Sequence, residues 1–294
     1  MILSNRVRIS LRTVALVYLT VLLVVPVGLI FWRSFEHGLG QFWEWITTPA
    51  AISALQLSLI IVVIVVPLNV VFGILTALAL ARSNFRGKGV LQSVVDLPFA
   101  VSPVVVGVAL IALWGADGWF GGLESTGFQI IFGLPGMVLA TIFVTLPFVV
   151  REVEPVLKEV GTEQEEAAVT LGATGWQTFW RITLPAIRWG LTYGVVLTIA
   201  RALGEYGAVT MVSSNFPGVS QTLTLLVHSR YTDDYNEYGA YAAATLLMMV
   251  AIVVLVVMTI VERRVQGRVA EASATTVDAE AGSKTSGSAT EEKN

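Results

Sequence analysis

The segment 162–185 concentrates carboxylates and small side chains between two long apolar runs. Its spacing is E-A-A-x3-G-x9-I-x-L-P, beginning at Glu166, and two further glutamates precede it. Negative charge at the start of a helix suits the helix dipole, and small side chains near a glycine leave a backbone slim enough to enter a groove on another protein. We therefore expect a docking surface for a partner, although the carboxylates would also cap and solvate a helix. The predicted docking residues are Glu163, Glu165, Glu166, Ala167, Ala168, Gly172, Ala173, Ile182, Leu184 and Pro185.

Local rules predict two short helices within the 162–185 loop. Thr162 with Glu165, and Thr174 with Gln177, have the spacing of capping boxes, in which each side chain binds the backbone amide of the other residue. Between them, Gly172 accepts left-handed backbone angles at little cost and predicts a bend. The proline that closes the spacing predicts the end of the second helix. We therefore expect two short helices that meet at a glycine and project from the membrane.

A second polar group stands inside an apolar run. Arg201 and Glu205 have the i,i+4 spacing that places two side chains on one face of a helix, and Gly204, Tyr206 and Gly207 flank the glutamate. A charge within a membrane is costly, so Arg201 is expected to face protein or a water-filled cavity and to have a partner. Two interpretations stay open. The residues form an internal ion pair that holds helices together, or they lie beside a path or gate through the membrane, where the glycines let helices approach closely.

The sequence carries no signal for catalysis. The phosphate-binding pattern G-x-x-x-x-G-K-[ST] does not occur, because Gly87-Lys88 is followed by Gly89 and no upstream glycine fits. The chain has no cysteine, and its two histidines, His37 and His228, are far apart in sequence. We expect no catalytic residue, no metal site and no cofactor in this chain, and no basic patch predicts binding to nucleic acid.

The composition predicts the elements that position these groups. The chain has 294 residues, of which 55% are hydrophobic and 13% charged, whereas soluble domains carry about 25% charge. Six apolar segments reach the roughly 20 residues that a membrane-spanning helix needs, and they predict an all-α polytopic protein embedded in membrane lipid. Asp96, close to Pro98 in the third segment, is a weaker candidate for a role in a membrane path. The segments are 13–32, 53–81, 90–114, 133–150, 190–212 and 239–261.

The basic residues predict the orientation. Fifteen of the 18 lysines and arginines fall before the first segment, in the loops around 82–88 and 151–188, or after the last segment. Cytoplasmic flanks are rich in Lys and Arg, so both termini and the 162–185 loop are expected in the cytoplasm. The predicted organisation is a cytoplasmic amino-terminal segment 1–12, a six-helix transmembrane domain 13–262 that includes the 162–185 loop, and a disordered cytoplasmic tail 263–294.

The spacing in the 162–185 loop resembles the cytoplasmic coupling loop of membrane subunits in ATP-driven (ABC) importers. Further runs, over about residues 50–262, resemble the W-type permease subunit of bacterial sulfate/thiosulfate importers. These runs are DLPFAVSPVVVG at 96–107, FVTLPFVVREVEPV at 143–156, ARALGEYGAVTMVSSN at 200–215 and DYNEYGAYAAA at 234–244.

The resemblance implies a fold and a set of partners. It implies a type I importer permease (MetI-like) fold in the cell membrane, import of sulfate and thiosulfate, and ATP hydrolysis by a separate subunit that binds ATP and Mg and docks on the 162–185 loop. The implied complex holds a homologous T-type permease, two copies of the ATPase subunit and an external sulfate-binding protein. The alternatives are a molybdate or tungstate permease of the same architecture, a membrane sensor or scaffold, and a passive channel.

Overall fold

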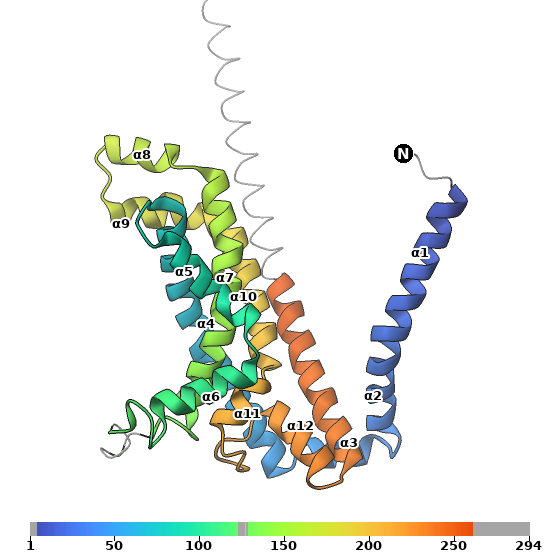
Figure 1. Cartoon of the computed structure of the whole chain (residues 1–294). Coiled ribbons are helices and arrows are strands. Elements are labelled where there is room, and N and C mark those ends of the chain that lie inside the picture. The colour runs from blue at the N-terminus through green and yellow to red at the C-terminus, as the bar shows by residue number, and fades with distance from the viewer. Residues whose placement is uncertain (1–4, 123–126, 128, 261–294) are drawn as a thin grey trace, which may run out of the picture. The chain divides into compact units, whose positions relative to one another are not determined.

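The computed structural model describes residues 5–122, 127 and 129–260, and every regular element in these residues is helical (Figure 1). The predicted tail 263–294 lies outside the described residues. The chain divides into two units, 1–250 and 251–294, and the described part of the second is the end of the last helix. The elements are α1 Asn5–Leu19, the π-helical turn η1 Thr20–Val24, α2 Val25–Phe35, α3 Leu39–Ile46, α4 Pro49–Arg82, α5 Lys88–Ala100, α6 Pro103–Trp114, α7 Leu134–Val160, α8 Glu163–Thr170, α9 Gly175–Thr178, the π-helical turn η3 Phe179–Thr183, α10 Leu184–Leu203, α11 Gly207–Val212, α12 Leu223–Thr232 and a last helix, Glu237–Ile260.

Within the described ranges, five helices are long and apolar enough to cross a membrane, and a sixth crossing results if the bent pair α5–α6 counts as one span. The first, Ile9–Phe35, buries none of its most apolar 18-residue stretch within the chain, as expected of a helix surrounded by lipid. One buried contact fastens its end, since the hydroxyl oxygens of Ser34 and Thr245 lie 2.6 Å apart. The predicted first segment is therefore a helix, longer at both ends than the sequence indicated.

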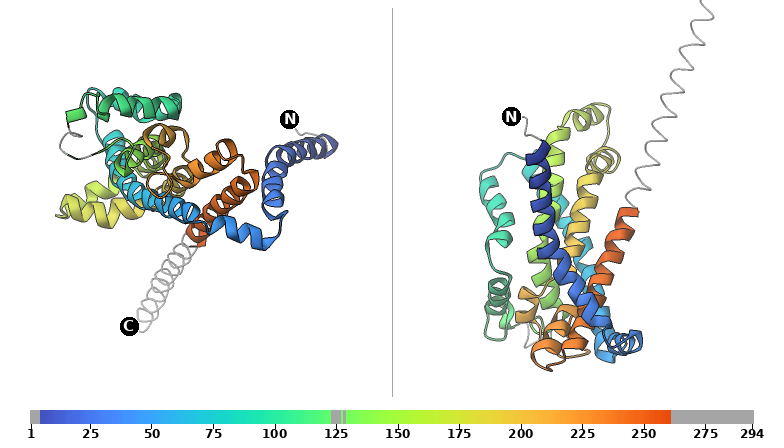
Figure 2. Two further views of the ribbon diagram at one scale, coloured as in Figure 1. Left: turned by 90° about the horizontal axis from the view of Figure 1, so that it is seen from below. Right: turned by 90° about the vertical axis from the view of Figure 1, so that its right-hand side faces the viewer.

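Three helices, α4, α7 and α10, pack side by side and form the centre of the first unit (Figure 2). Val149 of α7 is fully buried, with Gly73 of α4 and Gly194 of α10 both against it. A Cβ at Gly73 would lie 2.6 Å from Val149 Cγ1, and one at Gly190 would lie 2.4 Å from the carbonyl oxygen of Glu152. Small residues permit such close approach between membrane helices, so these three helices are locked together by shape.

The third predicted segment is not one straight span. Helices α5 and α6 meet at a bend of 115°. Ser102 has extended backbone angles (ψ 134°), as expected of a residue that precedes proline, and Pro103 occupies the start of α6, where no amide donor is needed. The two prolines of the 90–114 segment predict an interrupted span; the break is confirmed before Pro103, whereas Pro98 lies inside α5.

The fifth predicted segment is also broken. Helix α10 ends at Leu203 and α11 begins at Gly207, so residues 204–206 form a non-helical link. Arg201 thus lies in the last turn of α10 and not at the centre of a span over 190–212. The fourth predicted segment, 133–150, is shorter than the helix that forms, because α7 continues to Val160, ten residues beyond its predicted end.

The predicted helix end at Pro185 was wrong as well. Residues Gly175–Leu203 form one helix of 29 residues, and Pro185 stands in the first turn of α10. The π turn η3 precedes it, with the amide of Leu184 donating to the carbonyl of Phe179. In a π turn each amide bonds five residues back, and proline is tolerated at the start of the α-helical part that follows.

Candidate functional site

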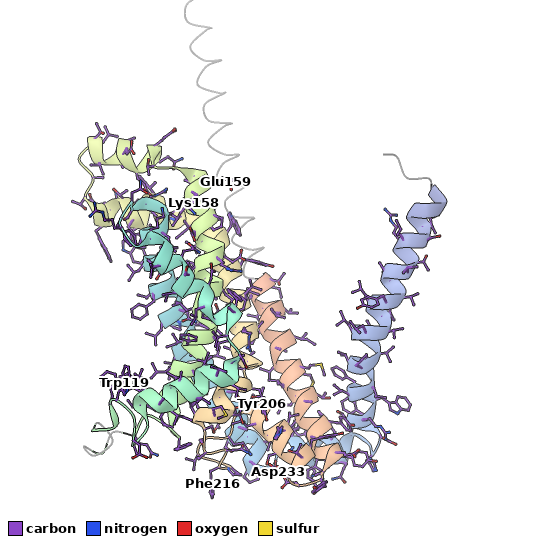
Figure 3. All side chains as sticks on the ribbon, in the orientation of Figure 1. Trp119, Lys158, Glu159, Tyr206, Phe216 and Asp233 are labelled. Atoms are coloured by element: carbon purple, nitrogen blue, oxygen red, sulfur yellow. The ribbon has the colours of Figure 1, made fainter. Side chains whose placement is uncertain are left out.

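The 162–185 loop forms α8, a bend and α9 at one end of the helices. Figure 3 shows Lys158 and Glu159, in the last turn of α7, at that end, and Phe216 and Asp233 at the opposite end. Gly172 has φ +88°, and its amide donates to the carbonyl of Val169 at 2.9 Å. The predicted bend at Gly172 is confirmed, because only glycine adopts these angles without strain.

The second predicted capping box is confirmed and the first was wrong. The Gln177 side chain accepts from the amide of Thr174 at 2.9 Å, and the Thr174 hydroxyl accepts from the amide of Gln177 at 3.4 Å. In contrast, the Thr162 hydroxyl makes no cap bond and donates to Glu166 Oε1 at 2.6 Å. Glu165, the other half of the first predicted box, turns to a partner 83 residues earlier in the chain.

That partner is Arg82, the last residue of α4. Its Nε and Nη2 donate to the two carboxylate oxygens of Glu165 at 3.0 and 3.2 Å. Its Nη1 donates to the carbonyl of Leu157 at 2.7 Å, and Nη2 also donates to that of Gly161 at 2.6 Å. The Thr183 hydroxyl donates to Glu165 Oε1 at 2.8 Å. One arginine and one glutamate therefore join α4, the end of α7, α8 and η3.

The outer surface of the loop is apolar and exposed. Leu171 is 89% exposed and Trp176 is 71% exposed, on either side of the Gly172 bend. A pocket between α8 and η3 is lined by small and apolar residues around the bend and by the polar residues Gln177, Thr178 and Arg181. Contiguous exposed apolar groups mark sites where another protein binds. We call the exposed residues Val169, Leu171, Trp176 and Trp180, together with Gly172, the docking surface.

The predicted docking residues are spread over this region. Glu163 and Glu166 are exposed on α8, whereas Glu165 is half-buried in the Arg82 contact. Ala167 and Ala168 precede the bend and Ala173 follows it. Ile182 lies in η3, and Leu184 and Pro185 begin α10, so these three belong to the joint between the loop and a membrane span.

The predicted pair of Arg201 and Glu205 forms. Arg201 Nη2 lies 2.7 Å from Glu205 Oε2, in an ion pair whose N–H is not aligned for a hydrogen bond. The Glu205 side chain is fully buried and Arg201 is 32% exposed. Glu205 Oε1 also accepts from the amide of Ala208 at 2.8 Å and so caps α11. The carboxylate therefore bridges the break between the two helices, which its spacing alone did not predict.

The glycines beside this pair differ. A Cβ at Gly207 would lie 3.0 Å from Pro103 Cβ, so Gly207 permits close contact between α11 and the start of α6. Gly204 has only ordinary contact with its own helix, and the expectation of a close approach there was wrong. The Tyr206 ring lies 5.2 Å from that of His228. The link 204–206 thus has α6 on one side and α12 on the other.

Asp96 is a partner of Arg151 on α7. Asp96 Oδ1 accepts from Arg151 Nη2 at 2.8 Å, and the guanidinium lies 4.2 Å from the centroid of the Phe99 ring. Pro98 lies within α5, between Asp96 and Phe99 in the sequence. Sequence reasoning missed both Arg82 and Arg151, although basic and acidic groups at membrane boundaries on one predicted side were a signal that such pairs form.

Comparison with known proteins gives several similarities. The family model described as "Binding-protein-dependent transport system inner membrane component" matches residues 69–267. The chain is 49% identical over 239 residues to the sulfate transport system permease protein CysW of Synechococcus elongatus, which covers 81% of this chain and 83% of that protein. It is 39% identical over 234 residues to the sulfate transport system permease protein CysT of Synechocystis sp., which covers 79% of this chain and 80% of that protein.

The structure resembles a chain of a bacterial alginate ABC transporter, solved in complex with an alginate pentasaccharide-bound periplasmic protein. The TM-score is 0.75 at 18% identity, over 89% of this chain and 95% of that chain. At this identity the likeness concerns the fold alone. It confirms the predicted all-α membrane fold of the importer-permease type.

Proposed function

This chain belongs to the family of binding-protein-dependent transport system inner membrane components, and from that membership we propose that it is the permease subunit of an ATP-driven importer of sulfate. The observation that carries the substrate is the 49% identity to a sulfate permease over four-fifths of the chain. We extend the proposal to thiosulfate, an anion of similar size, shape and charge.

A separate ATPase subunit supplies the energy in this proposal and binds ATP and Mg. The docking surface supports it, because Leu171 and Trp176 are apolar, exposed and placed on either side of the Gly172 bend. A chain that also resembles a second type of sulfate permease at 39% identity suits a heterodimer with a homologous T-type subunit. Two ATPase copies and an external sulfate-binding protein complete the proposed complex, with both termini of this chain in the cytoplasm.

The break between α10 and α11 is the proposed position of the gate. Residues 204–206 leave the helical path, and Gly207 is packed against Pro103 at the bend of α5 and α6. Residues at the ends of helices can absorb large changes in backbone angle and so act as hinges. Arg201, Gly204, Glu205, Tyr206 and Gly207 are therefore the residues that we place at or beside the translocation path.

Reconstitution tests the transport proposal. The chain, its partner permease, the ATPase and the binding protein are assembled in proteoliposomes, and uptake of labelled sulfate is measured with and without ATP. We expect ATP-dependent sulfate uptake that excess thiosulfate inhibits. Preferential uptake of molybdate or tungstate would replace sulfate as the substrate, and uptake without ATP would indicate a passive channel.

The docking surface is tested by a charge placed on it. Leu171→Glu is expected to prevent co-purification of the ATPase, because a carboxylate at the centre of an apolar contact must be desolvated. Phe216→Glu, at an apolar position of the opposite end that is 66% exposed, is the control and keeps the ATPase bound. Retention of the ATPase by Leu171→Glu would contradict the proposed docking.

A further inference from the structure

The 162–185 loop is connected unequally to the membrane helices. Towards the carboxyl end, α9 continues through η3 into α10 as one helix, so the continuous helix transmits motion of the loop to α10. Towards the amino end, α7 stops at Val160, and Gly161 has φ +71° and ψ −171°. A glycine outside the helical region is a joint about which α8 can swing. Helix α4 is not adjacent to the loop in sequence, because α5, α6 and α7 lie between them.

Arg82 closes that joint. Its guanidinium donates to the carbonyl of Gly161 at 2.6 Å and to that of Leu157 at 2.7 Å. Leu157 is among the last four residues of α7, whose carbonyls lack partners within the helix. The same guanidinium holds both oxygens of Glu165 on α8. Its side chain is 16% exposed and that of Glu165 is 21% exposed, so water screens the contact little.

From these contacts we propose that Arg82 is a positioning residue for coupling, which makes α8 move as one body with α4 and α7. The inference rests on the proposed function of the 162–185 loop and adds a residue outside it. Without Arg82, displacement of α8 would be absorbed at Gly161. With Arg82, it reaches α4 and α7 directly, and the interlocked contacts at Gly73 and Gly194 share it with α10.

The chemistry of the site requires an arginine. The planar guanidinium of Arg82 donates four hydrogen bonds, two to the carboxylate of Glu165 and one to each of two backbone carbonyls. A guanidinium has five donors in a fixed plane, whereas a lysine ammonium has three on a flexible stem. Arg82→Lys therefore keeps the charge opposite Glu165 but not the full set of bonds.

The transport test measures sulfate imported per ATP hydrolysed by the assembled complex. Arg82→Gln is expected to keep the ATPase bound and active but to lower this ratio by at least about tenfold, the factor that corresponds to loss of one of the four hydrogen bonds of Arg82. Arg82→Lys should lower it by only about threefold, since half of that interaction remains. Arg82→Gln with Glu165→Gln should be no worse than Arg82→Gln alone, because both changes break one contact. Arg86→Gln, which changes an exposed arginine four residues after Arg82, is the control and should leave the ratio unchanged.

A distance measurement separates this inference from the proposed function. The chain has no cysteine, so Ser83→Cys and Gln164→Cys introduce two spin-label sites, one beside Arg82 and one on α8. In the assembled complex we expect a narrow distance distribution that Arg82→Gln broadens and Arg86→Gln does not. A distribution that stays narrow in Arg82→Gln, or an unchanged ratio of sulfate to ATP, would overturn the inference. Absence of ATP-driven uptake in the unmodified complex would overturn the proposed function instead.

Discussion

Replacement of Arg201 by leucine removes the partner of a fully buried carboxylate. Glu205 would keep only its bond from the amide of Ala208. Loss of one member of a buried pair costs about 3–5 kcal/mol because the other charge stays behind. Arg201 is 32% exposed, which screens part of the interaction, so we expect the free energy of unfolding to fall by about 3 kcal/mol, the lower limit of that range.

The double variant Arg201→Leu with Glu205→Gln tests the reasoning. The glutamine keeps an acceptor oxygen for the amide of Ala208 and removes the charge that Arg201 neutralised. We therefore expect the double variant to lie within about 1 kcal/mol of the unmodified protein, the value of one ordinary hydrogen bond. The two effects are then strongly non-additive, as for residues in direct contact.

Thermal unfolding of the purified complex and sulfate uptake are measured separately. A loss of 3 kcal/mol corresponds to a fall of roughly 6–12 °C in midpoint, by the scaling for domains of 150–250 residues. Recovery of the midpoint without recovery of uptake in the double variant would show that Arg201 acts on the passing anion. A normal midpoint and full uptake in Arg201→Leu would refute both roles.

Three further predictions concern backbone, packing and topology. Gly172→Val forces a branched side chain onto a φ of +88°, at a cost of at least about 1–2 kcal/mol. It is expected to abolish ATP-driven uptake while the spans stay inserted. Normal transport by this variant would contradict the role of the bend. Gly190→Ala places a Cβ 2.4 Å from a backbone oxygen and should lower stability by about 1–3 kcal/mol. Gly28→Ala, with open space around it inside α2, should leave the melting midpoint unchanged or slightly raised, because alanine favours a helix over glycine. A reporter fused after Lys158 should read cytoplasmic and one at Asp233 external; the reverse result would exclude docking of a cytoplasmic ATPase on the 162–185 loop.

Features set by neighbouring residues could be predicted from the sequence. The capping box of Thr174 and Gln177 and the bend at Gly172 follow from local spacing and backbone freedom, and both are present. The apolar segments predicted the membrane helices for the same reason, since length and composition are local properties. The break before Pro103 also follows from the sequence, because proline disfavours a helical residue before it.

Features set by distant residues could not be predicted. Glu165 has the spacing of a capping residue, but Arg82 lies nearby in the fold and offers two charge-assisted bonds where an amide offers one neutral donor. Glu205 pairs with Arg201 and also accepts a hydrogen bond at the start of α11, and α10 ends before it. Glu165 thus exchanges a local partner for a distant and stronger one, whereas Glu205 keeps its local partner Arg201 and adds the amide of Ala208 across the helix break.

The π turn η3 lies between most of the docking surface and α10, within one helix over Gly175–Leu203. Such a turn holds one residue more than an α turn, and each helical residue corresponds to about 100° of rotation around the axis. Removal of one residue of η3 other than Trp180 would let this turn adopt α geometry and would change the direction of the surface little, because the extra residue is held within the same revolution. Removal of one residue from the α-helical part of α10 would instead turn the surface by about 100° relative to the rest of that helix. The angular setting of the surface is thus encoded by the count of residues between it and the membrane, separately from the side chains that would touch a partner.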